Sequence, residues 1–398
     1  MALKKQHTDE RLTQFPGSDI VAILDTDWCA FPVSSVGDEL YIEVTHTASG
    51  KVKEFKNVTE FRGRGKKIGG WLGELNAERE EADKPPFKPD SFTIEHKQRR
   101  KVEYRVKEVS AGHYEKNKDS YELLDSTEDT EVGNVVVRQQ LTEEEALVNI
   151  KHSAKSVIAK ALRELGTHKY ESYIGYGGRM REDISTLMQY KGNRKNTLKP
   201  LVMDDVVEYL TDSFNSQPVY HIENDDKVVM RAYGDSNAVV VGVDKDFYGQ
   251  PCKFFNADRP EEGIVDCDCF GELREYSSSK SKAIGHGRIF LYWQLLAGDT
   301  SDNYKANCFS DVKYAGAGAF KDLKDCKDDK EALERVIEVF KRLYPEPKVV
   351  TGWRGNDFLI DWLYVAREQF KMAAMLRYEG DARTLDTEFE EYGVEYEY

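Results

Sequence analysis

The sequence lacks any long apolar run, and no part of its 398 residues approaches the ~18 consecutive apolar residues of a membrane-spanning helix. Residues 1–14 are polar and contain no apolar stretch of the kind found in a secretory signal. Cysteine is scarce, and its spacing fits neither a paired zinc site nor a small disulfide framework. The cysteines are Cys29, Cys252, Cys267, Cys269, Cys308 and Cys326. We therefore expect a cytoplasmic protein that makes no membrane contact.

Positive charge is in deficit, because 57 lysines and arginines face 72 aspartates and glutamates, which gives a formal net charge of −15. Such a field repels a polyanion such as DNA at long range. The objection weakens if many of the acids gather around bound cations, because a bound metal reverses the local sign of charge. Whether the acids cluster therefore decides whether nucleic acid fits as a partner.

Internal repeats and low-complexity tracts are absent too, and what is present is an alternation of short apolar runs with helical patterns. The expected strands are 19–24, 173–176, 218–222 and 238–243. The expected helices are 142–165, which Thr142 and Glu145 would cap, then 203–214, one beginning near Asn224, 284–297, 330–343 and 357–378. Strands that alternate with helices predict an α/β fold with a mostly parallel central sheet flanked by helices.

The segment at about 36–140 has a different sequence pattern, which predicts a strand-rich insertion. Its expected strands are 40–44, 52–55, 92–94, 102–109 and 135–137. We expect a core at 1–282 that carries this insertion, and a helical region at 283–398 that ends in a loosely packed acidic tail from Asp381. The insertion is rich in basic residues, which could follow a DNA backbone or could keep exposed strands soluble. They are Arg62, Arg64, Lys66, Lys67, Lys97, Arg99, Arg100, Lys101, Arg105 and Lys107.

Carboxylates follow each of the strong strands of the predicted sheet. They are Asp25 and Asp27 after the first, Glu223, Asp225 and Asp226 after 218–222, Asp244 and Asp246 after 238–243, and Asp299 with Asp302 after the helix 284–297. The carboxyl ends of parallel strands meet at one edge, so these acids should converge there. They cannot all ionise without counter-charge, and oxygen-only ligands favour Mg²⁺ or Mn²⁺. Two such ions ~3.5–4 Å apart would suit hydrolysis of a phosphodiester. A single Asp after a strand is more often a helix cap or turn former.

Five short motifs then carry a family resemblance. They are Ile23-Leu24-Asp25-Thr26-Asp27, Tyr190-Lys191-Gly192-Asn193-Arg194, Glu223-Asn224-Asp225-Asp226, Val243-Asp244-Lys245-Asp246-Phe247 and Gly298-Asp299-Thr300-Ser301-Asp302-Asn303. In this order they resemble the motifs of the 5′ nucleases, the flap-endonuclease and 5′→3′ exonuclease family, in its phage-encoded branch. The resemblance covers about 19–33 and 142–325.

The resemblance implies a 5′ nuclease or PIN-like fold with a helix-three-turn-helix-like region in 283–398. It implies two Mg²⁺ ions, for which Mn²⁺ can substitute, held by Asp25, Glu223, Asp225, Asp226, Asp244, Asp246, Asp299 and Asp302. It implies catalytic roles for Lys191 and Arg194, with DNA contacts by Arg179, Tyr190, Lys191 and Arg194.

The implied activity is metal-dependent 5′→3′ exonuclease, extending to flap endonuclease, on DNA with free 5′ ends or flaps and on RNA primers. The implied setting is replication, primer removal or recombination in a phage-infected bacterial cell, with replication proteins as partners through the insertion or the tail.

The sequence departs from the family pattern at Tyr176, where relatives commonly place an acid, and this predicts one weak metal position. The family's glycine-rich hairpin is only loosely matched by residues 314–318. Two alternatives stay open. One is a nuclease-fold module that binds DNA or protein without catalysis, and the other is a PIN-like ribonuclease.

Overall fold

We examined the protein as a computed structural model that describes residues 19–65, 68–125, 133–194, 197–275 and 283–397. Lys66, Lys67 and the polar segment 1–14 therefore lie outside the described residues. The chain folds into two compact units. Unit 1 is formed by the described parts of Met1–Ala30, Lys155–Lys195 and Val207–Tyr398, and unit 2 by those of Phe31–Ala154 and Asn196–Val206.

Unit 1 is built on a six-stranded sheet with the order β12-β11-β10-β1-β8-β9. Its strands are β1 (Val21–Asp25), β8 (Tyr170–Gly175), β9 (Gln217–Val219), β10 (Ala238–Gly242), β11 (Lys253–Asn256) and β12 (Ile264–Asp266). All neighbouring pairs are parallel except β11 with β12, which are antiparallel. The α/β class and the mostly parallel sheet are therefore confirmed.

The two central strands are apolar because both of their faces are covered. Ala22, Ile23 and Leu24 of β1 pair with the β-branched run of β10, and these side chains are all buried. α8 (Asn224–Ala232) packs on β1, β8 and β10. The expected helices 142–165 and 203–214 are present as α5 (Glu143–Leu165) and α7 (Met203–Phe214). Thr142 and Glu145 form the expected reciprocal cap of α5.

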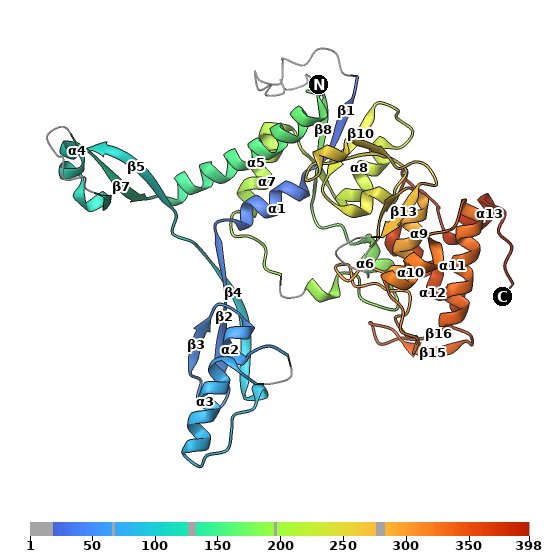
Figure 1. Cartoon of the computed structure of the whole chain (residues 1–398), viewed down its shortest axis with the longest axis horizontal. Helices are drawn as coiled ribbons and strands as arrows, with labels where there is room; N and C mark the ends of the chain where they lie inside the picture. The colour runs from blue at the N-terminus through green and yellow to red at the C-terminus, as the bar shows by residue number, and fades with distance from the viewer. Residues whose placement is uncertain (1–18, 66–67, 126–132, 195–196, 276–282, 398) are drawn as a thin grey trace. The chain divides into compact units, whose positions relative to one another are not determined.

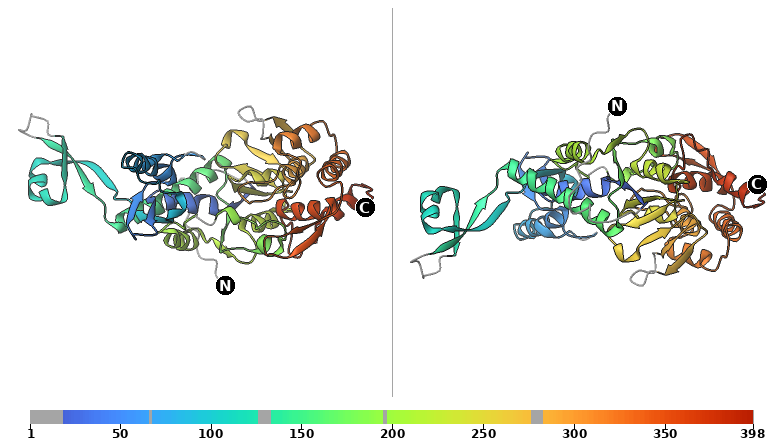
Figure 2. Two further views of the ribbon diagram at one scale, coloured as in Figure 1. Left: turned by 90° about the horizontal axis from the view of Figure 1, so that it is seen from below. Right: turned by 90° about the horizontal axis from the view of Figure 1, so that it is seen from above.

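The C-terminal part of unit 1 contains α9 (Arg288–Ala297), α10 (Gly316–Leu323), α11 (Asp329–Leu343) and α12 (Trp362–Ala373). Figure 1 and both views of Figure 2 show these orange and red helices grouped together. Their buried side chains belong to the same hydrophobic core as β1 and β10, as Ile23, Tyr292 and Phe340 illustrate. These helices therefore belong to unit 1 together with the central sheet.

Two expected helices begin later than predicted, because a hairpin strand precedes each. β14 (Ala283–His286) pairs with β13 (Glu272–Glu275) before α9 begins. β16 (Asp357–Ile360) pairs with β15 (Lys348–Thr351), and the Asp361 side chain then caps α12. The acidic tail is not loosely packed. It contains α13 (Leu385–Glu391), whose Leu385 and Phe389 are buried.

Unit 2 holds the insertion, whose predicted strands are all present. β2 (Asp38–His46), β3 (Val52–Phe55) and β4 (Phe92–Arg100) form one sheet, and β5 (Tyr104–Ser110), β6 (Glu122–Asp125) and β7 (Asn134–Gln140) form another. The helices α2 (Val58–Arg62), α3 (Gly70–Glu81) and α4 (Ala111–Lys116) were not predicted. Phe55, Phe61, Leu72 and Phe92 give the first sheet a core of its own.

The basic side chains on β4 are neutralised by neighbouring acids. Lys97 pairs with Glu43 and Glu95. Arg99 pairs with Glu39 and Glu54, and Arg100 with Asp38 and Glu103. The pairs of Lys97 and Arg99 are solvent-exposed, whereas Arg100 pairs with the buried Asp38. Paired charges of this kind suit a strand surface better than a phosphate track, which needs uncompensated positive charge. Within the described residues, no helix has both the length and the apolar character needed to cross a membrane.

Candidate active site

Three predicted acids lie at the carboxyl edge of the sheet, where Asp25 is buried, Asp225 is half-buried and Asp244 is exposed. Asp25 is the last residue of β1, Asp225 lies in the first turn of α8, and Asp244 follows β10. Asp225 is not the N-cap of its helix, because Glu223 holds that position. Asp244 does cap a short turn, by accepting the N–H of Asp246 at 2.9 Å. We call Asp25, Asp225 and Asp244 the acidic centre.

Electrostatic repulsion shows that the acidic centre is a true cluster. Burial, followed by the charges of Asp27 and Asp244, raises the pKa of Asp25 to about 8. Burial, with the charges of Asp25 and Asp244, also holds the pKa of Asp225 well above its usual range. Asp25 is held by Asn224, whose amide donates to its Oδ1 at 2.6 Å. Within the described part of the chain, none of the three acids forms an ion pair, and the charge of Lys191 only partly offsets the rise in the pKa of Asp225.

A second group of acids surrounds Lys245. The Lys245 ammonium lies 2.8 Å from Asp246 Oδ1 and also contacts Asp299. Burial, together with the charge of Asp244, raises the pKa of Asp246 to about 7. Burial would also raise the pKa of Asp299, but the charge and hydrogen bond of Lys245 outweigh it and leave that pKa below its usual range. Lys245 therefore bridges two of the predicted ligands.

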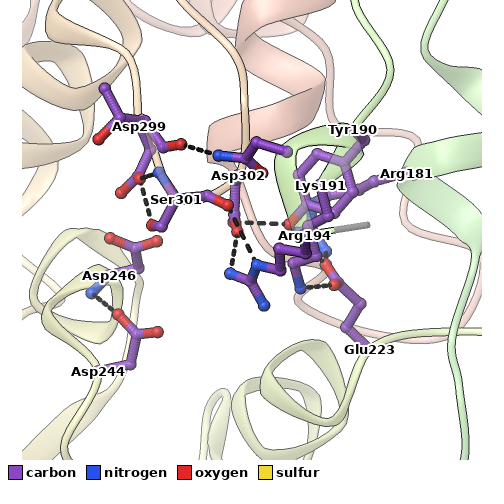
Figure 3. Close-up of polar contacts among 12 residues, drawn as sticks. Arg181, Tyr190, Lys191, Arg194, Glu223, Asp244, Asp246, Asp299, Ser301 and Asp302 are labelled. Atoms are coloured by element: carbon purple, nitrogen blue, oxygen red, sulfur yellow. Dashed lines mark hydrogen bonds and ion pairs between the residues drawn. The ribbon is translucent and has the colours of Figure 1, made fainter. Parts of the chain in front are cut away.

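The third group contains the basic motif and two further predicted ligands, Glu223 and Asp302. The Tyr190 hydroxyl lies 3.0 Å from Glu223 Oε2 and 2.8 Å from Asp302 Oδ2. Lys191 pairs with Glu223, and Arg194 Nη2 lies 2.7 Å from Asp302 Oδ1. In Figure 3, Asp244, Asp246 and Asp299 lie at one side of the site, and Glu223 with its basic partners lies at the other.

Lys191 is fixed by its backbone as well as by its side chain. Its φ of +54° lies in the left-handed region, which a residue with a side chain rarely adopts. Its N–H donates to the carbonyl of Asp302 at 2.9 Å. Burial would lower the pKa of Lys191, but the charges of Glu223 and Asp302 raise it above the usual value. The side chain therefore stays cationic beside the acids.

Asp226 has a different partner from the one we predicted. It is fully buried, and its two oxygens lie 2.6 and 3.0 Å from the Arg181 guanidinium. The N–H of Leu376 also donates to its Oδ1, at 2.8 Å. Arg181 contacts Glu223 Oε2 at 2.5 Å as well. The carboxylate of Asp226 is thus taken up by an internal salt bridge, and in this structure it is not one of the acids that lack a counter-ion.

Tyr176 does not stand among the carboxylates as we expected. It follows the last residue of β8, and its ring packs against Tyr220 with centroids 5.3 Å apart. The carboxylate at the end of β8 comes instead from Asp27, whose Oδ1 accepts the N–H of Gly175 at 2.9 Å. Arg179, which we expected to contact DNA, is exposed at the start of α6 (Met180–Ile184).

The glycine-rich segment 314–318 leads into α10, where Gly316 is buried and its carbonyl accepts the indole N–H of Trp293.

The donor chemistry of the site suits a hard cation. The acids offer only oxygen atoms, which Mg²⁺ and Mn²⁺ prefer. Within the described residues, no three Asp, Glu, His or Cys side chains are arranged to hold one ion as they stand. Binding would therefore have to draw carboxylates together, including Glu223, which is now paired with Lys191, and Asp246 and Asp299, which are bridged by Lys245.

Comparisons with protein-family models, with curated proteins and with solved structures find no match to this chain. The interpretation of the site therefore rests on its own residues. Two of these were missed from the sequence, namely Arg181 and Lys245. Lys245 stands between two predicted ligands in the chain, which could have pointed to it, whereas Arg181 lies 45 positions from Asp226.

Proposed function

We propose that this protein is a metal-dependent 5′ nuclease that hydrolyses DNA phosphodiester bonds near free 5′ ends or flaps. The observation that carries the proposal is the acidic centre. Its three carboxylates repel one another and have no ion pair within the described residues, and the charge of Lys191 acts on Asp225 beside them. A site with that charge pattern favours divalent cations together with an anionic substrate.

The ligands of the ions would come from the acidic centre and the acids around it, namely Asp246, Asp299, Glu223 and Asp302. When bound, such ions neutralise charge at the phosphodiester and activate water for hydrolysis. Asp226 is left out of this set because Arg181 occupies its carboxylate. We assign it the role of holding Arg181, and through Arg181 the carboxylate of Glu223.

Lys191 and Arg194 are the groups proposed to contact the reacting phosphate. Each is paired with an acid of the proposed ligand set, Lys191 with Glu223 and Arg194 with Asp302. The raised pKa of Lys191 keeps its donor charged at neutral pH. Charge-assisted donors held in place in this way stabilise negative charge that develops during phosphodiester hydrolysis.

The test is cleavage of end-labelled single-stranded DNA, RNA and 5′-flapped duplex in Mg²⁺ or in chelator. We expect Mg²⁺-dependent release of products from the 5′ end of DNA. Asp244→Asn should reduce the rate about a hundredfold or more, because at least ~3 kcal/mol of transition-state stabilisation is lost. The matched control is Asp268→Asn, which changes an exposed aspartate that belongs to none of the groups above and should retain full activity.

Each outcome identifies a function. Cleavage of RNA alone would indicate the ribonuclease alternative, and binding without cleavage would indicate a module without catalysis. Full activity of Asp244→Asn would show that the acidic centre is not the active site.

A further inference from the structure

Two tyrosines form an exposed pair at the carboxyl edge of the sheet. Tyr176 follows β8 and is 45% exposed, and Tyr220 follows β9 and is 55% exposed. Their rings pack together with centroids 5.3 Å apart. Large aromatic surfaces are usually buried or used in binding, so a pair left open to solvent beside a candidate site calls for an explanation.

The backbone that carries Tyr220 is strained and firmly held. His221 has a φ of +69°, and the N–H of Ile222 donates across it to the carbonyl of Tyr220 at 2.8 Å. A three-residue turn of this sign is rare and costs conformational energy. The carbonyl of His221 accepts the N–H groups of Arg179 and Met180, which ties the turn to the segment after Tyr176.

Gly178 makes this contact between the two segments possible. A Cβ atom at this position would lie 2.0 Å from the carbonyl oxygen of Ile222, so the backbones approach more closely than any side chain would permit. The N–H of Tyr176 also donates to the carbonyl of Val219 at 2.9 Å. The paired rings are therefore placed by fixed backbone on both sides.

Polar side chains flank the pair. Arg179 and His221 are both exposed, and within the described residues the Arg179 guanidinium takes part in no ion pair. This contrasts with the basic residues of β4, whose charges are already paired with acids. We call Tyr176, Arg179, Tyr220 and His221 the tyrosine platform.

The tyrosine platform adjoins the candidate active site along both chain segments. Gly175, directly before Tyr176, donates its N–H to Asp27. Glu223 is the first residue after the strained turn and is paired with Lys191. A DNA strand with a phosphate beside Lys191 would therefore have its neighbouring nucleotides close to the tyrosine platform.

We propose that the tyrosine platform binds an unpaired nucleobase of single-stranded DNA next to the cleavage site, with Arg179 and His221 contacting its backbone. The inference rests on the proposed function, because it gives the substrate of that site a single-stranded part. Aromatic side chains bind bases through their faces whatever the sequence, and flanking positive charge adds salt-dependent affinity.

The test is binding of fluorescent poly-dT to the full chain in chelator, where no metal-dependent cleavage occurs. Tyr176→Ala with Tyr220→Ala should weaken binding by about tenfold or more, since stacking one base contributes roughly this much. Tyr176→Phe with Tyr220→Phe keeps both rings and should bind as the wild type does. The matched control is Tyr233→Ala with Tyr378→Ala, which removes another exposed tyrosine pair, at the other end of α8.

A second measurement separates stacking from loss of fold. A set of strands, each with one abasic nucleotide at a different position, should show one position at which the wild type binds weakly. The double alanine variant should bind all the abasic strands with the same affinity. Circular dichroism and thermal unfolding should show that this variant is folded. Arg179→Ala should instead lower the salt dependence of binding, with a slope smaller by about one.

The outcomes distinguish this proposal from the nuclease proposal. Three results would overturn the platform, even if Mg²⁺-dependent cleavage is present. They are equal affinity of the wild type for every abasic strand, unchanged affinity of the double alanine variant, and no binding of poly-dT. A position-specific abasic effect that the double alanine variant lacks would support the platform, even if no strand is cut.

Discussion

Arg181 is a buried cation shared between two carboxylates at the start of α8. Its guanidinium contacts both oxygens of Asp226 and one oxygen of Glu223, and it also donates to the carbonyl of Ala374 at 2.9 Å. A buried charge requires oppositely charged and hydrogen-bonded partners of this kind, because its desolvation is costly. The same contacts fix the direction of Glu223 at the candidate site.

Removing the charge of Arg181 should therefore be strongly destabilising. Arg181→Met leaves the Asp226 carboxylate buried without a cationic partner, and we expect a loss of about 3–5 kcal/mol in the free energy of unfolding. Adding Asp226→Leu should restore much of that loss, since no unpaired charge remains. Urea titration of the two single variants and the double variant measures the coupling.

The control is Arg335→Met, which breaks an exposed pair with Glu338 and should cost at most about 1 kcal/mol. Equal losses in the free energy of unfolding for the Arg181 and Arg335 variants would contradict the proposed contribution of the buried salt bridge.

At the scale of elements, the hairpin of β15 and β16 holds the C-terminal end of α6. The Arg354 guanidinium donates to the carbonyls of Glu182 at 2.8 Å and Ser185 at 2.9 Å. The indole N–H of Trp353 also donates to Ser185, at 3.0 Å. These are carbonyls that a helix leaves without an internal partner, so the hairpin caps the short helix that carries Arg181.

Arg354→Ala should loosen α6 without removing any proposed active-site group. We expect a loss of about 1–2 kcal/mol in stability, in line with hydrogen bonds made by a charged donor. We also expect slower cleavage, because Arg181 and Glu223 lose part of their support. The comparison variant is Arg274→Ala, whose exposed side chain pairs with Glu272. If both variants unfold at the same urea concentration, the capping role is wrong.

At the scale of the whole molecule, the raised carboxylate pKa values make stability depend on pH. In the folded metal-free protein, burial and the neighbouring acids raise the pKa of Asp25 to about 8, whereas the ordinary pKa of an aspartate in an unfolded chain is 3.8. The folded state therefore binds more protons than the unfolded state in this window, and stability must fall as the pH rises through it. Asp246, with its pKa of about 7, acts in the same direction.

Mg²⁺ should reverse this loss most strongly where the acids are ionised. We expect the metal-free melting temperature to be lower at about pH 8 than at about pH 5, and the increase on adding Mg²⁺ to be larger at the higher pH. Differential scanning calorimetry with Mg²⁺ or chelator measures both. Asp25→Asn should weaken the dependence of the metal-free melting temperature on pH. A metal-free melting temperature that rises over this range would refute the assignment.

The insertion offers a second test at this scale. Every acid of the candidate site lies in unit 1, whereas residues 36–140 belong to unit 2, which has its own small core. A chain in which a short flexible linker replaces 36–140 should keep Mg²⁺-dependent cleavage of simple single strands. Cleavage assays, with circular dichroism to verify the fold, decide this. A folded deletion variant without activity would show that the insertion completes the active site.

The sequence by itself determined the parallel sheet and the place of most of the acids. A buried parallel strand requires an unbroken apolar run such as 21–24, and the strand must end where polar residues such as Asp25 begin. The carboxyl ends of parallel strands share one edge, so local pattern alone was enough to bring Asp25, Asp225 and Asp244 together. The hairpins before α9 and α12 were missed, because a short strand depends on the partner with which it pairs.

Only the tertiary structure decided how the charges are shared. Asp226 and Asp225 are neighbours in one motif, yet Arg181 neutralises the first and leaves the second without an ion pair in the described chain. The outward stacking of Tyr176 on Tyr220 was equally invisible, because it depends on a strained turn and on the close approach at Gly178. The physical reason is that Coulomb and packing energies depend on distances in space. The chain separates Tyr176 from Tyr220 and Arg181 from Asp226 by more than 40 positions, so only the fold brings each pair together.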